Sequence, residues 1–79
     1  MKFVKFEVCE GGPYREFTYK YSEYINVKKI KSFHVWKDPN GKRGLQLNDG
    51  RSKIFGNYKY IPVDKDQFKE AFGLDWDEL

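Results

Sequence analysis

The sequence predicts a single-domain α+β protein in which an antiparallel sheet of about five or six strands is packed by one short C-terminal helix. Apolar and polar residues alternate in several segments between residues 2 and 61, turn residues separate these segments, and a helix-capping pattern follows at residues 63–73. The chain of 79 residues has room for one domain, residues 1–79. Aromatic residues make up 19% of the chain, and the large area that each ring buries offsets the short length.

The N-terminal part of the sequence predicts a β-hairpin. In residues 2–9, the apolar residues Val4, Phe6 and Val8 alternate with charged residues, which is typical of a strand with one buried face. We expect residues 10–13 to end this strand, because two glycines and a proline follow each other there. Residues 14–21 alternate again, with aromatic side chains at every second position from residue 17, and predict the second strand.

Two shorter segments follow the predicted hairpin. Residues 24–27 predict a brief separate strand, and the lysine-rich residues 28–31 lack alternation and predict a helical turn or a corner. Further along, residues 58–61 are expected to be extended, with Pro62 at a strand end or edge because proline cannot donate a ladder hydrogen bond.

Residues 30–56 predict a β-meander of three strand-like segments. Turn signals that contain Asn and Gly separate the segments at residues 38–41 and 48–50. His34 and Trp36 share the face opposite the apolar residues of their segment, so they would lie away from the core if that apolar face packs on the helix. The apolar residues of the first two segments are Phe33, Val35, Leu45 and Leu47.

The end of the domain carries the signals of one helix of two to three turns. Asp64 and Gln67 have the spacing of a capping box, with Asp in place of Ser or Thr. Val63 and Phe68 have the spacing of a hydrophobic staple, and Gly73 is placed to end the helix in the left-handed region.

Charge is distributed unevenly along the chain. Thirteen Lys and Arg against six Asp and Glu give +7 up to Val63, whereas two Lys against six acids give −4 after it. A basic sheet joined to an acidic end would attract either a polyanion or its own C-terminal part. In the acidic segment 73–79, Trp76 either folds back onto the domain or contacts a partner.

The sequence lacks the residues that several classes of function require. Cys9 and His34 are the sole cysteine and histidine, which excludes an internal disulfide framework and the usual Cys/His zinc sites. A nucleophilic cysteine would have His34 as its one imidazole base, so we expect no enzyme, no cofactor and no metal. The lone cysteine, and the absence of a stretch of roughly 20 apolar residues, predict a cytoplasmic protein without membrane association.

Two families resemble parts of this sequence. The order of residues 24–72, from Y-I-N-V through S-F-x-V and G-L-Q-L-N-D-G to a short closing helix, is similar to small β-rich domains of the flagellar FlbD-like type. This resemblance implies a compact non-enzymatic domain. Residues 36–41 and 61–68 resemble the turn and the sheet-to-helix junction of coactivator-type single-stranded-DNA binders. The second resemblance implies nucleic-acid binding by the sheet.

We therefore expect a small non-catalytic binding protein that modulates a larger macromolecule, with a protein as the favoured partner. Its size and composition suit phage or mobile-element modulators of host machinery. The alternative is a nucleic-acid-binding protein that uses basic and aromatic side chains of the sheet. Whether Trp36 is exposed or covered by the N-terminal hairpin, the strand order and the oligomeric state stay open. The predicted partner-binding residues are His34, Trp36, Lys37, Lys42, Arg43, Arg51, Lys53 and Trp76.

Overall fold

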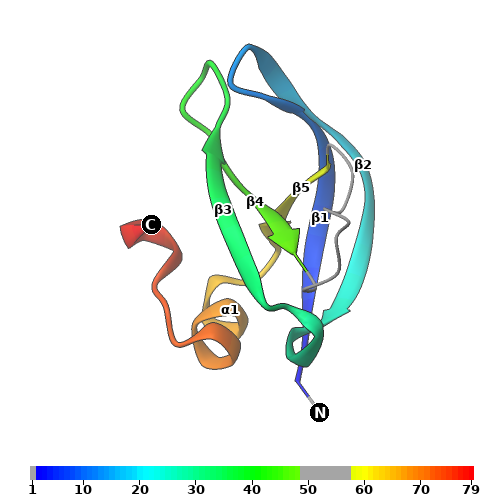
Figure 1. Cartoon of the computed structure of the whole chain (residues 1–79), viewed down its shortest axis with the longest axis vertical. Helices are drawn as coiled ribbons and strands as arrows, with labels where there is room; N and C mark the ends of the chain where they lie inside the picture. Colours follow the sequence, from blue (N-terminus) through cyan, green and yellow to red (C-terminus); the bar gives the residue numbers. More distant parts are fainter. Residues whose placement is uncertain (1, 49–57) are drawn as a thin grey trace.

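The structure, a computed structural model, describes residues 2–48 and 58–79. These residues form one antiparallel five-stranded sheet with the order β2-β1-β5-β4-β3, together with one α-helix (Figure 1). The chain therefore has the expected antiparallel sheet with a short helix. In sequence order the elements are β1 (Phe3–Gly12), β2 (Arg15–Asn26), η1 (Val27–Lys29), β3 (Ser32–Lys37), β4 (Arg43–Asn48), β5 (Tyr58–Pro62), α1 (Lys65–Phe72) and η2 (Trp76–Glu78).

β1 and β2 form the predicted hairpin, but both strands are longer than expected. The expected break at residues 10–13 is wrong, because β1 continues to Gly12 and the chain turns at residues 13–14. Gly11 has a φ of 137°, and a Cβ there would lie 2.7 Å from the Glu16 carbonyl oxygen. The glycine thus lets the two strands stay paired through an irregularity instead of ending them.

β2 unites two segments that the sequence pattern separates. Its register with β1 shifts between Val8, which pairs with Tyr21, and Cys9, which pairs with Tyr19. Val8 and Cys9 project to opposite faces, so the bulge at Lys20 also puts the two tyrosines on opposite faces. The expectation that residues 17, 19 and 21 share one face is therefore wrong, since a bulge changes the phase of alternation within one continuous strand.

The rest of the sheet follows the predictions where the structure describes it. The 3-10 turn η1 confirms the predicted corner, and β5 confirms the extended segment, with Pro62 as its last residue. β3 and β4 pair in a regular antiparallel register from Ser32 opposite Asn48 to Lys37 opposite Arg43. The third segment of the meander lies outside the described residues, as does most of the turn at residues 48–50.

Helix α1 begins and ends where the sequence predicts. The Asp64 carboxylate accepts hydrogen bonds from the backbone N–H groups of Asp66 and Gln67, and Gly73 ends the helix with a φ of 72°. In a capping box the Gln67 side chain would accept a hydrogen bond from the Asp64 backbone N–H. Here it accepts one from the Lys5 backbone N–H at 3.0 Å. This bond ties the first turn of the helix to β1, beyond the point where β5 ends.

The core lies between α1 and one face of the sheet, which we call the helix face. Phe72 stacks on Phe68 at 4.6 Å between ring centroids and meets Phe6 and Phe33 edge-on. Aromatic rings therefore fill much of the space between helix and sheet, as the composition predicts. The buried core residues are Val4, Phe6, Val8, Ile25, Leu45, Leu47, Tyr60, Phe68 and Trp76.

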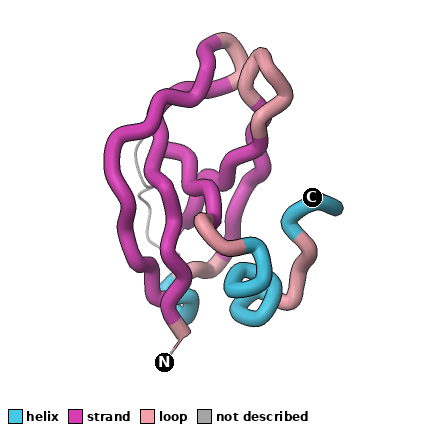
Figure 2. Tube along the Cα trace, turned by 180° about the vertical axis from the view of Figure 1, so that it is seen from behind, coloured by secondary structure: helices cyan, strands magenta, loops and turns pink. Residues whose placement is uncertain are grey.

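The sheet curls until its two edge strands meet at one end. The Asp38 carboxylate, which follows β3, accepts a hydrogen bond from the Phe17 backbone N–H of β2 at 3.2 Å. The β1–β2 and β3–β4 turns consequently lie side by side, as both views show (Figures 1 and 2). In the described ranges, no helix is long and apolar enough to cross a membrane.

Candidate functional site

The strand register assigns side chains to the two faces of the sheet. Residues that stand opposite each other in neighbouring strands project to the same face, and successive residues of one strand project to opposite faces. Val8, Tyr60 and Leu45 form a row across β1, β5 and β4 on the helix face. The next row along the strands lies on the other side, which we call the pocket face. It consists of Cys9, Lys59, Gln46 and His34.

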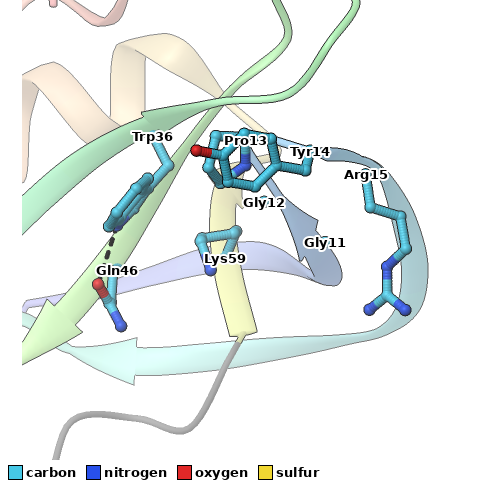
Figure 3. Close-up of a pocket in the computed structure, with 8 residues that line it drawn as sticks. All are labelled: Gly11, Gly12, Pro13, Tyr14, Arg15, Trp36, Gln46 and Lys59. Carbon is cyan, nitrogen blue, oxygen red and sulfur yellow. Dashed lines mark hydrogen bonds between the residues drawn. The ribbon is translucent and has the colours of Figure 1, made fainter.

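A pocket of about 360 Å³ opens on the pocket face beside the β1–β2 turn. Trp36 and Gln46 form one side of it, residues 11–15 form the other, and Lys59 lies between them (Figure 3). The β1–β2 turn and the strands β3, β4 and β5 thus all contribute to the pocket. They come together because the sheet curls and brings the β1–β2 turn toward β3.

Trp36 is fixed at the rim of this pocket. Its indole Nε1 donates a hydrogen bond to Gln46 Oε1 at 2.8 Å, and its ring is half-buried. The Lys59 amine lies 5.7 Å from the centroid of the ring, within the range of a cation–π contact. The sequence left open whether Trp36 is exposed or covered by the N-terminal hairpin. The structure shows it partly covered, because the β1–β2 turn lines the same pocket without covering the ring completely.

Lys59 places a positive charge within the sheet face. It is 6% exposed, although it lies on the face opposite the main core. Burial lowers the pKa of the Lys59 amine from its ordinary value, because a buried charge loses hydration. A negatively charged group in the pocket would favour the charged amine and would therefore interact strongly with it.

A small apolar cluster supports the pocket. Cys9 and Phe17 are buried on this face, separate from the main core. A Cβ at Gly44 would lie 2.9 Å from Lys59 Cβ and 3.1 Å from Phe17 Cε2. The absence of a side chain at Gly44 therefore lets Phe17 and the stem of Lys59 pack closely over β4.

The structure divides the predicted partner-binding residues between the two faces. His34, which is exposed, and Trp36 lie on the pocket face, as expected. Lys37 and Arg43 stand opposite each other in β3 and β4 and project to the helix face. This corrects their prediction as partner-binding residues together with Trp36, which lies on the other face. Lys42 is exposed in the β3–β4 turn. Arg51 and Lys53 lie outside the described residues.

Of the two alternatives for Trp76, the structure shows the one in which it folds back onto the domain, and this corrects its prediction as a partner-binding residue. It is 7% exposed and packs edge-on against Phe68 at 5.3 Å between ring centroids. An Arg43 guanidinium N–H donates to the Trp76 carbonyl oxygen, and the guanidinium carbon lies 5.9 Å from the centroid of the indole ring. Both residues therefore hold the C-terminal segment on the domain, and neither presents a free surface to a partner.

The geometry gives the pair Cys9 and His34 no catalytic arrangement. Strands β5 and β4 lie between their strands in the sheet. Burial raises the pKa of the Cys9 thiol, which disfavours the nucleophilic thiolate. Among residues 2–48 and 58–79, no group of three or more His, Cys, Asp or Glu side chains could hold a metal ion.

Sequence reasoning missed most of the pocket, because Trp36 is its one lining residue among the predicted partner-binding residues that the structure describes. Tyr14, Arg15 and Gln46 line it, and the sequence interpretation assigned none of them to a site. One signal was present for Lys59, because it alternates with the apolar Tyr60 and therefore belongs to the face opposite the core. The contribution of the β1–β2 turn carries no such signal, since it depends on the curl of the sheet.

No protein-family model matches this sequence, and no curated protein and no solved structure is significantly similar to it. The resemblances to FlbD-like domains and to coactivator-type single-stranded-DNA binders therefore stay predictions.

Proposed function

We propose that this protein is a small non-catalytic binding protein that acts by occupying a surface of a larger macromolecule. The observation that carries the proposal is the state of Trp36, whose ring is partly exposed at the pocket rim and is hydrogen-bonded to Gln46. A large ring that is already ordered loses little conformational freedom on binding, which suits it to anchor an interface.

The pocket face is the surface that we assign to this binding. It combines the exposed His34 with the ring of Trp36 and with Tyr14, which is 97% exposed at the tip of the β1–β2 turn. The helix face is less suitable because α1 and the C-terminal segment pack on it. A partner would thus contact one side of the sheet while the other side maintains the fold.

A pull-down from lysate of the native host tests the proposal. The tagged wild-type protein should retain a specific macromolecule, and Trp36→Ala should reduce its affinity at least about tenfold, as expected for an anchoring aromatic residue. Val35→Ala is the matched control, because Val35 precedes Trp36 in β3 and its partly exposed side chain projects to the opposite face. Retention of full affinity by a folded Trp36→Ala variant would refute the assigned surface.

A further inference from the structure

The pocket combines two aromatic rings, Tyr14 and Trp36, with two cationic side chains, Arg15 and Lys59. No carboxylate of the described residues lines it. Single-stranded nucleic acid offers the complementary groups, because its bases stack on aromatic rings and its phosphates pair with Lys and Arg. We propose that the pocket binds one nucleotide of a single-stranded nucleic acid, with the base stacked on Trp36 and the phosphate held by Arg15 and Lys59. This inference rests on the proposed function, since it uses the same face.

The geometry of Trp36 suits a stacking platform. Its edge is occupied by the hydrogen bond to Gln46, so the ring cannot turn away without breaking that bond. On the other side of the pocket, Tyr14 belongs to the turn and is almost fully exposed, which leaves its ring accessible to a base (Figure 3). Stacking on such rings is tolerant of base identity, so we expect binding with little sequence preference.

The charges of the pocket suit a phosphate. Arg15 is exposed at the start of β2, where its guanidinium can form two parallel hydrogen bonds to phosphate oxygens. Lys59 is buried beside Trp36 and its amine loses hydration there, so a nearby phosphate would favour the charged form of the amine. The two cations come from different strands, and both line the pocket (Figure 3).

The pocket face extends beyond one nucleotide. Tyr19 pairs with Cys9 and Tyr24 pairs with Lys5, so both tyrosines project to this face, where they are 56% and 62% exposed. The two tyrosines are five positions apart in β2, a length of roughly 16 Å at the usual rise of a strand. The Lys5 amine lies 5.8 Å from the centroid of the Tyr24 ring. This series of rings favours a strand of nucleotides over a free mononucleotide.

Other polyanions fit these groups less well. In duplex nucleic acid the bases are already stacked on each other, so the exposed rings would find no free base face. An acidic peptide would satisfy Arg15 and Lys59, but its carboxylate side chains have no flat ring to stack on Trp36. Glu7 also projects to this face from β1 without lining the pocket. Its charge would repel a nucleic acid and an acidic peptide alike, so it does not distinguish between them.

Fluorescence anisotropy with short labelled DNA and RNA single strands tests the inference. Both should bind at low salt, and the logarithm of affinity should fall with the logarithm of salt concentration by about 0.7 for each phosphate contacted. Arg15→Gln should make this slope less negative by about 0.7. Lys37→Gln, which removes an equal charge from the helix face next to Trp36, should leave the slope nearly unchanged.

Variants at Trp36 test the stacking contact. Trp36→Ala should weaken binding to single strands by roughly 5- to 150-fold, the factor that corresponds to the loss of one stacked base. Trp36→Phe should keep part of the affinity, and it replaces the alanine variant if circular dichroism shows that the latter does not fold. Two results together would overturn the proposal, because they would show that general charge attraction explains the binding. The first is an equal effect of Arg15→Gln and Lys37→Gln on the salt slope. The second is unchanged affinity of Trp36→Phe or of a folded Trp36→Ala.

Competing ligands separate the nucleic-acid inference from the wider binding function. A mononucleotide or polyglutamate that binds as tightly as the single strand, or a duplex that binds more tightly, would overturn the inference. No binding of single strands at low salt would also overturn it. If single strands do not bind and nuclease-treated lysate still yields a partner that depends on Trp36, the proposed function stands and the nucleic-acid inference fails. If Trp36 affects neither assay, both fail.

Discussion

Asp38 connects the two edges of the sheet through a single side chain. Its Oδ2 accepts the hydrogen bond from Phe17, while Oδ1 accepts from the backbone N–H groups of Asn40 and Lys42 at 2.9 and 2.8 Å. Burial of Asp38 disfavours its charged form, but these three donors and the charge of Lys42 outweigh burial and lower the pKa of its carboxyl. The sequence predicted the turn at residues 38–41, yet nothing in it indicated the bond to β2.

Asp38→Asn should destabilise the fold above about pH 4. The amide cannot accept hydrogen bonds at both positions, so at least one of the three N–H groups loses its partner. Because the folded-state pKa of Asp38 is depressed, its carboxylate contributes stability above the unfolded-state value of about 3.9, and this stability is lost as the pH falls through the folded-state pKa. Urea denaturation at several pH values should show the wild type and the variant converging in acid. A difference that stays constant across the pH range would contradict this role.

At the scale of elements, helix α1 and the segment after it close the helix face. The helix has a defined beginning at Asp64 and a defined end at Gly73, and it is tied to β1 by the bond between Gln67 and Lys5. The next segment returns along the helix, where Lys65 and Asp77 form an exposed ion pair at 2.9 Å. Since exposed ion pairs contribute little, the burial of Trp76 holds this segment more strongly than its charges do.

Asp64→Ala should lower the free energy of unfolding by about 0.5 to 2 kcal/mol, because two backbone N–H groups of the first turn lose their acceptor. Asp66→Ala is the control, since it removes an equal charge from the same turn and leaves the N-cap in place. Chemical denaturation should show the larger loss for Asp64. Equal losses for both variants would indicate that charge near the helix terminus, and not the cap, stabilises the helix.

At the scale of the molecule, the two tryptophans have opposite roles because they belong to opposite faces of one sheet. Trp76 completes the core under Arg43, whereas Trp36 stands at the rim of a pocket. Trp36 lies between Val35 and Lys37, whereas Trp76 lies between Asp75 and Asp77, and composition alone does not distinguish the two rings. The placement of one ring in the core and of the other at a pocket rim is a property of the whole fold.

Trp76→Ala should cost about 3 to 5 kcal/mol, the usual loss when a buried large aromatic side chain is removed. A domain of this size has a total stability of only about 4 to 12 kcal/mol, so the melting temperature should fall sharply. Trp36→Ala should cost less than about 2 kcal/mol, because its ring is half-buried and packs outside the main core. Thermal and chemical denaturation of both variants provide the check, and a larger loss for Trp36 would contradict the assignment of the two faces.

The predictions from sequence succeeded where neighbouring residues alone decide the structure. The alternation around Val4, Phe6 and Val8 predicted the buried face of β1, and Asp64 with Gly73 predicted both ends of α1. They failed at the bulge near Lys20, because one extra residue changes which side chains share a face. The grouping of Lys37 and Arg43 with Trp36 failed for a simpler reason, since neighbours in a strand project to opposite faces.

By itself, the sequence determined that this chain forms an antiparallel sheet with a capped C-terminal helix, because alternation, turn residues and caps act over a few residues. It also placed Trp36 on the face opposite the apolar residues of its strand. Only the tertiary structure decided the strand order and what lies beside that ring. The pocket depends on the curl that Asp38 secures and on residues from both hairpins and β5, and such contacts between distant segments leave no local pattern in the sequence.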